Sequence, residues 1–184
     1  MKELLIKLNA CNEARKWASN KSIDEIWATC HRGDWMLWLA RKLNIDKRVL
    51  TLAKGHCANT VRHLMKDERS IAAVDMAIKY GEGNATDSEL AAAAAAAAYA
   101  ADAAAYAAYA AYAAAAYAAD AAAYAAADDA DAAAYAAAAY AAYDATAAAR
   151  KKSQQATAEI CRKYIPLDLI LSGIKSQEKQ KEGI

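Results

Sequence analysis

Tyrosine and aspartate recur along one side of an alanine-rich segment, and their spacing is the most distinctive pattern in this sequence. From Asp102 to Tyr135 ten of the eleven Tyr and Asp residues, all except Asp129, follow one another at intervals of three to five, 3.67 residues on average. At 100° per residue all ten fall within about 80° of Asp102 on a helix. Carboxylates accept hydrogen bonds from Arg and Lys, and Tyr rings supply rigid contact area, so this Tyr/Asp stripe predicts a protein-binding surface. The residues expected to carry it are Asp102, Tyr106, Tyr109, Tyr117, Asp120, Tyr124, Asp128 and Asp131.

The opposite side of the same segment is almost bare alanine, which gives the segment a second interpretation. Of the 59 residues from 91 to 149, 43 are Ala, the residue with the highest helix propensity. A face of small side chains lets two helices approach closely. This face therefore predicts packing on the N-terminal helices or on a second copy of the chain. The two interpretations are compatible, because they use opposite faces of one helix.

Two Cys/His pairs are the remaining candidates for chemistry. Cys30-His31 and His56-Cys57 suggest a metal site, but their spacing matches no standard zinc pattern, and adjacent residues lie 100° apart on a helix. The sequence also lacks a phosphate-binding loop, a dinucleotide fingerprint and a GxSxG nucleophile motif. We therefore expect no catalytic residue, no metal and no cofactor, in a protein that is not an enzyme.

Composition narrows the fold class and the compartment. With no Phe, one Pro and six Gly in 184 residues, the chain lacks the turn residues that a sandwich or barrel needs, which excludes an all-β fold. The hydrophobic content of 58% is mostly Ala, and the mean hydropathy is −0.10. The sequence contains no run of about 20 strongly apolar residues, so it predicts no membrane span. The first 20 residues lack a secretory signal pattern, so we expect a cytoplasmic protein. Four cysteines without CxxC spacing then predict buried thiols: Cys11, Cys30, Cys57 and Cys161.

Charge divides the chain into three blocks. Residues 1–79 carry a net charge of +6, residues 80–149 carry −9 with no Lys or Arg, and residues 150–184 carry +4. This asymmetry favours docking between oppositely charged surfaces. The basic clusters are typical of solvated helix faces, so nucleic acid is not an expected partner.

Helix signals are dense in the first 80 residues. We expect a helix over 1–18, a second that begins at the capping box of Ser22 and Glu25 and ends at Gly33, and a third capped by Asp34. Helices over 47–65 and 67–80 follow. Together they predict an N-terminal bundle of short helices at 1–80. Its expected core is Trp17, Trp27, Trp35, Leu37, Trp38 and Leu39.

The second region begins after the sequence GEGN at 81–84. Thr86 and Glu89 form another capping box, and the Ala-rich pattern predicts one long Ala/Tyr-rich helix, or a helical hairpin broken near Asp128, over 86–166. The period of 3.67 residues favours the continuous helix, because the stripe keeps its phase across the break. Residues 172–184 are predicted to be a disordered tail. The fold class is therefore all-α.

Four blocks of sequence resemble an all-α family of immunity proteins from bacterial polymorphic-toxin loci and phage genomes. They are HRGDWMLWL at 31–39, CANTVR at 57–62, DERS at 67–70 and GNATDSEL at 83–90, followed by the Ala/Tyr tract. The resemblance covers about 10–166. It implies a helical protein that neutralises a cognate toxin or effector by direct contact, without chemistry of its own. The alternative that we retain is a structural or self-assembling protein, phage-encoded, that forms a homo-oligomer through its Ala face.

Overall fold

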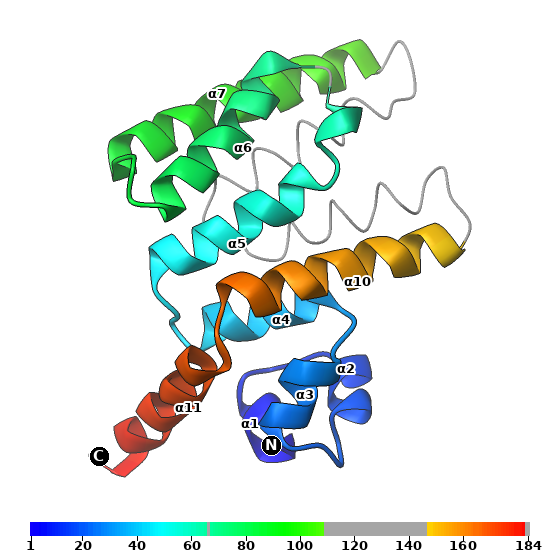
Figure 1. Cartoon of the computed structure of the whole chain (residues 1–184), viewed down its shortest axis with the longest axis vertical. Helices are drawn as coiled ribbons and strands as arrows, with labels where there is room; N and C mark the ends of the chain where they lie inside the picture. The colour runs from blue at the N-terminus through cyan, green and yellow to red at the C-terminus, as the bar shows by residue number, and fades with distance from the viewer. Residues whose placement is uncertain (66, 109–146, 183–184) are drawn as a thin grey trace.

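The computed structural model describes residues 1–65, 67–108 and 147–182. Within these ranges the chain consists of helices joined by short turns and contains no strand, which confirms the all-α prediction there. Figure 1 shows the helices stacked in a row, with α7 at one end and α1, α2, α3 and α11 at the other. None of the helices that the described ranges contain has the length and apolar character needed to span a membrane.

The N-terminal region forms four short helices: α1 (Lys2–Lys7), α2 (Asn12–Trp17), α3 (Ile23–Thr29) and α4 (Gly33–Lys42). The single helix predicted over 1–18 is wrong, because Asn9 adopts a left-handed backbone with φ of 60° and separates α1 from α2.

The predicted capping box of α3 is confirmed. The backbone N–H of Glu25 donates to Ser22 Oγ at 3.2 Å, and that of Ser22 donates to Glu25 Oε2 at 2.7 Å. Two orphan donors of the first turn are thus satisfied inside the same turn.

The middle of the chain contains α5 (Lys47–Asn59), a 3₁₀ turn (Arg62–Leu64), α6 (Glu68–Gly81) and α7 (Asp87–Ala108). Asp46 caps α5 by accepting from the backbone N–H groups of Arg48 and Val49, and Asp67 caps α6. The starts of these helices lie close to the predicted ones, whereas α5 ends at Asn59, before the predicted end at Met65. Helix α5 packs against α6, and α6 packs against α7.

The last helices are α10 (Ala147–Tyr164) and α11 (Leu167–Glu182). Helix α10 packs on α4 and α5, whereas α7 packs on α6, and the end of α7 and the start of α10 lie on the same side of the stack (Figure 1). These two helices are therefore not segments of one straight rod. The remainder of the predicted Ala-rich region, 109–146 with Asp128, lies outside the described residues.

The disordered tail predicted for 172–184 needs correction, because α11 continues to Glu182. Apolar residues at Leu167, Ile170 and Ile174 recur at helical spacing and pack on the first core cluster, and Ile170 is fully buried. Gly173 lies on the same side, where an added Cβ would come within 2.9 Å of Leu43. The burial of this face stabilises α11. The polar residues after 174 had favoured disorder in the sequence prediction.

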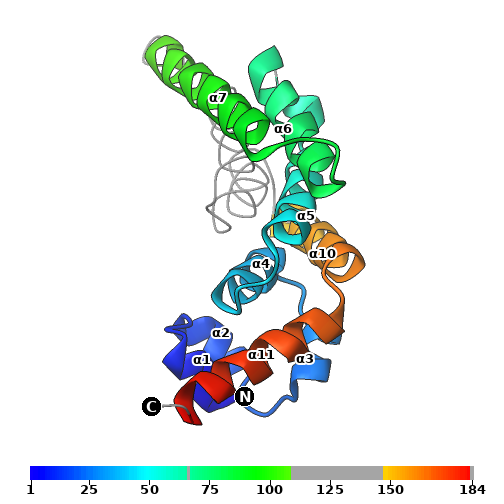
Figure 2. The same ribbon diagram turned by 90° about the vertical axis from the view of Figure 1, so that its left-hand side faces the viewer.

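Two apolar clusters form the core, and they do not follow the predicted division between 1–80 and 86–166. The first unites α1 to α4 with α10, α11 and most of α5. The second unites the end of α5 with α6 and the start of α7. Figure 2 shows the helices in the same order from the side, with α5 between the two ends of the stack. Helix α5 therefore joins the two clusters.

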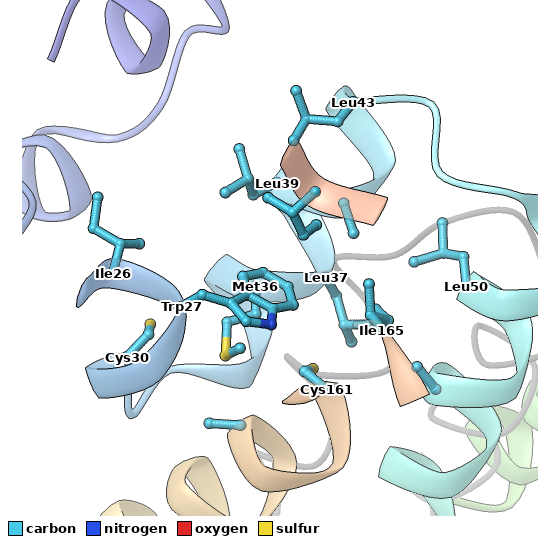
Figure 3. Packing of buried hydrophobic residues seen from close by; sticks show 14 of the residues in the cluster. Ile26, Trp27, Cys30, Met36, Leu37, Leu39, Leu43, Leu50, Cys161 and Ile165 are labelled. Atoms are coloured by element: carbon cyan, nitrogen blue, oxygen red, sulfur yellow. The ribbon is translucent and has the colours of Figure 1, made fainter. Parts of the chain in front are cut away.

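Trp27 lies at the centre of the first cluster and is 4% exposed. Figure 3 shows Met36 and Leu37 next to it, with Cys161 and Ile165 on the side of α10. The prediction of burial is confirmed for Trp27, Leu37 and Leu39. The other three tryptophans are partly buried and pack at the edge of the cluster: Trp17, Trp35 and Trp38.

Helix α4 crosses α10 at Gly33, where the two backbones leave no room for a side chain. A Cβ on Gly33 would lie 2.4 Å from Thr157 Oγ1 and 2.7 Å from the Thr157 carbonyl carbon. Gly33 is thus the first residue of α4, not the end of the preceding helix as predicted. Asp34 is not its cap either: Arg32 occupies that position without a capping side chain.

The different burial of two tryptophans predicts different costs of truncation. We expect Trp27→Ala to lower the free energy of unfolding by about 3–5 kcal/mol, the usual range for a buried Trp. Trp38→Ala should cost about half as much, because its side chain already contacts water. Urea denaturation followed by circular dichroism measures both. Equal losses would contradict the core assignment.

The crossing at Gly33 predicts a strong effect of one added methyl group. Gly33→Ala should lower the unfolding free energy by about 1–3 kcal/mol or more, because the neighbouring atoms belong to a helix backbone that cannot move aside. Gly83 is the matched control: it has φ of +85° and nothing within 4 Å of an added Cβ. Gly83→Asn should cost less than about 1 kcal/mol, since Asn tolerates this backbone conformation. A Gly33→Ala variant as stable as Gly83→Asn in urea would refute the close crossing.

Candidate functional site

The structure describes only part of the predicted Tyr/Asp stripe. Asp102 and Tyr106 lie in α7, although their side chains are outside the described part of the structure. The other predicted residues lie outside the described residues altogether: Tyr109, Tyr117, Asp120, Tyr124, Asp128 and Asp131. The stripe therefore stays a prediction, and the described residues define the helix from which it begins.

Helix α7 starts at the capping box that the sequence predicted. The backbone N–H of Thr86 donates to Glu89 Oε2 at 2.7 Å, and that of Glu89 donates to Thr86 Oγ1 at 3.2 Å. The Thr86 backbone N–H most strongly, and then its hydroxyl, lower the pKa of Glu89 by donating to the carboxylate. The box fixes where the helix begins, and hence which Ala residues share a face.

The turn before α7 is held by Arg48 of α5. One guanidinium nitrogen donates to the carbonyl oxygens of Tyr80 at 2.6 Å and Ala85 at 3.2 Å, and the group stacks 4.4 Å above the Tyr80 ring. A charged donor thus satisfies carbonyls at both ends of the α6–α7 turn. This contact sets the angle at which α7 returns along α6.

Asp87, the first residue of α7, is held in place by two neighbours. Lys47 Nζ lies 2.8 Å from Asp87 Oδ1, and the Tyr80 hydroxyl donates to the same oxygen at 2.9 Å. The hydrogen bond with Lys47, followed by that with Tyr80, lowers the pKa of Asp87. An exposed pair of this kind contributes little to stability. The two contacts instead fix the orientation of α7, because Lys47 belongs to α5 and Tyr80 belongs to α6.

Over residues 90–98, where its side chains are described, α7 is covered on one face. Leu90 and Ala97 are buried, and Ala93 and Ala94 pack against the same cluster as α6. Their spacing of three, four and seven residues is that of one helical stripe. Ala96 is half-buried, and four other alanines of this stretch are exposed: Ala91, Ala92, Ala95 and Ala98. The beginning of α7, which lies at one end of the stack of helices (Figure 1), therefore carries exposed alanines.

A second exposed surface, which the sequence analysis missed, joins α2 to the start of α4. The Trp17 ring lies 6.1 Å from that of Trp35 and meets the ring of His31 edge-on at 6.3 Å. Lys21 lies 4.2 Å from the Trp17 ring and Arg32 lies 4.5 Å from the Trp35 ring. Trp beside Arg is the composition typical of interface hot spots. The available signal was the polarity of the residues flanking each Trp.

Arg32 also makes an ion pair that explains Asp34. Its Nε donates to Asp34 Oδ1 at 2.8 Å, and a second guanidinium nitrogen donates to Asp34 Oδ2. This fork raises the pKa of Arg32, with the hydrogen bond as the main cause. Asp34 thus holds a guanidinium against Trp35, a role that the predicted helix cap did not include.

The Cys/His pairs do not form a metal site in the described part of the chain. No group of three or more His, Cys, Asp or Glu residues able to hold an ion occurs there. His56 instead stacks on Tyr164, with ring centroids 4.2 Å apart and planes 6° from parallel. Burial first, and Lys163 second, lower the pKa of His56. Three of the predicted buried thiols are buried, whereas Cys11 is exposed.

Comparison with known proteins adds no relative to this description. No protein-family model, curated protein sequence or solved structure matches the chain.

The lowered pKa of His56 predicts a dependence of stability on pH. A pKa below the ordinary 6.5 in the folded state means that folding favours the neutral ring. This stabilisation is complete above pH 6.5 and is lost as pH falls through the folded pKa. The melting temperature should therefore fall from pH 7.5 to pH 5.5. In His56→Phe, which keeps an aromatic ring against Tyr164 but cannot titrate, the fall should be smaller.

The exposed His63 provides the matched control for this measurement. His63→Asn should retain the pH dependence of the unmodified chain, measured by differential scanning calorimetry at the two pH values. A pH dependence that survives in His56→Phe and disappears in His63→Asn would contradict the assignment.

Proposed function

We propose that this chain is a non-enzymatic binding protein of the immunity type, which neutralises a cognate toxin or effector by direct contact through α7 and the acidic segment that follows it. The observation that carries the proposal is the half-covered helix α7. It is anchored at its start by Thr86, Asp87 and Glu89 and is packed on α6 by one face. Its uncovered side is held at a fixed orientation and is accessible to a partner.

In this proposal, residues of the four blocks that resemble the immunity family build the fold, and other residues contact the partner. Gly33 makes the crossing with α10, Arg62 pairs with Asp75 of α6 at 2.9 Å, and Asp67 caps α6. Thr86 and Glu89 start α7. Each of these residues builds the scaffold. The proposed partner surface lies in the Ala/Tyr tract that follows these four blocks.

Charge indicates the chemistry of the partner. The block 80–149 has nine acids and no Lys or Arg, so a surface drawn from it attracts a basic protein. Carboxylates of the stripe would accept hydrogen bonds from Arg and Lys while Tyr rings pack between them. Electrostatic steering then accelerates association at low salt. A toxin with a basic cleft, such as a nuclease, fits this chemistry.

A charge-neutralised variant tests the proposal. Asp102, Asp120, Asp128 and Asp131 are changed together to Asn, and the chain is used to capture partners from the native host. We expect the unmodified chain to retain a basic protein and to suppress its toxicity on co-expression. The variant should bind that purified protein at least about tenfold more weakly, with a smaller dependence on salt, and should melt at nearly the same temperature.

The matched control removes the same number of negative charges elsewhere. Exposed acids of the described helices serve this purpose: Glu3→Gln, Asp24→Asn, Glu159→Gln and Glu178→Gln. The control should bind as the unmodified chain does. Equal weakening by both sets would reduce the effect to net charge, and unchanged binding by the stripe variant would refute the proposed surface.

A structural or self-assembling role is the second candidate, and the exposed alanines of α7 favour it. Such a surface lets a second α7 approach closely, so two copies would pack through Ala91, Ala92, Ala95 and Ala98. At 100° per residue these alanines share the side of Asp102, so self-assembly would use the side of the stripe and not the opposite Ala face expected from the sequence. Ala95→Lys should then dissociate the oligomer in analytical ultracentrifugation. Ala72→Lys, at an exposed position of α6, should not. A chain that sediments as a monomer at all concentrations would exclude this role.

A further inference from the structure

Two thiols meet where α5 packs against α10. Cys57 and Cys161 are both 0% exposed. The Cys57 thiol donates to the carbonyl oxygen of Thr157 at 3.8 Å, and Thr157 lies one helical turn before Cys161. The pKa of Cys161 is raised well above its ordinary value, first by a hydrogen bond with Cys57 and then by burial. These contacts bring the two thiols together at the interface between α5 and α10.

Further contacts fix this pair. Cys161 Sγ lies 3.6 Å from the carbonyl oxygen of Gly33, so the thiol is enclosed by α4, α5 and α10. Figure 3 shows Cys161 beside the central Met36 and Leu37. A disulfide requires close approach of the two backbones. The packing of α5 against α10 places both thiols in one interface.

The cysteine pair lies at the point where α5 joins the two core clusters. Cys57 belongs to the first core cluster, and the next residue, Ala58, belongs to the second. Helix α5 thus joins the clusters at this point. A covalent bond from Cys57 to α10 would close a loop of about 100 residues, which restricts the unfolded chain strongly.

We propose that Cys57 and Cys161 are a redox-sensitive pair, which a low-molecular-weight disulfide converts into an intramolecular disulfide that locks α5 to α10. One protein thiol loses its proton and attacks the reagent disulfide, forming a mixed disulfide and releasing one reagent thiol. The second protein thiol loses its proton and displaces the other. The protein loses two hydrogen atoms, and the reagent disulfide is reduced to two thiols.

Burial controls when this reaction occurs. The thiolate is the reactive form, and burial disfavours it. Attack on an external disulfide therefore requires a transient separation of α5 and α10. The bond forms in molecules in which this interface opens, and it then keeps the interface closed. This inference does not depend on the proposed partner.

The test uses the full chain carrying Cys11→Ser, which removes the exposed thiol and leaves a side chain that can cap α2. The protein is incubated at pH 8 with oxidised glutathione, in urea just sufficient for iodoacetamide to alkylate Cys57. We expect a product lighter by two hydrogen atoms, and a peptide pair joining residues 57 and 161 in a non-reducing digest. Its melting temperature should rise by about 5 °C or more and return with dithiothreitol.

Two variants complete the experiment. Cys30→Ala removes a buried thiol that bonds within its own turn, to Arg32, and should leave the crosslink intact, whereas Cys57→Ala should abolish it. Glutathione adducts without a crosslink, a crosslink through Cys30, or thiols that stay reduced in that urea would each overturn the proposal. A crosslink that lowers the melting temperature would overturn the locking. If a variant fails to fold, the peptide map of the Cys11→Ser chain still shows whether residues 57 and 161 are crosslinked.

Discussion

At Gly33 the backbone of α4 rests on Thr157 of α10, and the rest of the first cluster depends on this contact. Because the helices approach so closely, Arg162 reaches across and donates to the carbonyl oxygens of Trp27 at 3.3 Å and Cys30 at 2.8 Å. A cation thus satisfies the exposed carbonyl end of α3. Residues from the two ends of the chain form one core, so the N-terminal helices are completed by α10.

In the second cluster, the Ala-rich helix α7 is positioned by contacts at its start. Alanine buries little apolar area, so an Ala-rich helix gains orientation from its anchors more than from its own packing. Arg48 and Lys47 supply those anchors from α5, through the α6–α7 turn and Asp87. Each exposed pair contributes little free energy. Together they determine which alanines contact α6 and which remain exposed, and therefore what surface a partner would meet.

Helix α5 connects these two arrangements. Its Asp46 cap fixes the start, Cys57 near its end contacts α10, and the next residue, Ala58, belongs to the second cluster. A displacement of either face of α5 alters the packing of both clusters, because a helix moves as a rigid unit. The partner surface that we propose on α7 and the thiol pair on α10 are thus linked by one element.

The sequence by itself determined features that are decided within one helical turn. The caps at Ser22, Asp46 and Thr86 were predictable, because each side chain bonds a backbone group two or three residues away. For the candidate site, periodicity indicated a two-faced helix but not its neighbours. Only the tertiary structure decided that Gly33 makes a helix crossing, that Trp35 lies at the edge of the core and that α11 is ordered along Ile170. These outcomes depend on partners that are distant in sequence, which local spacing does not encode.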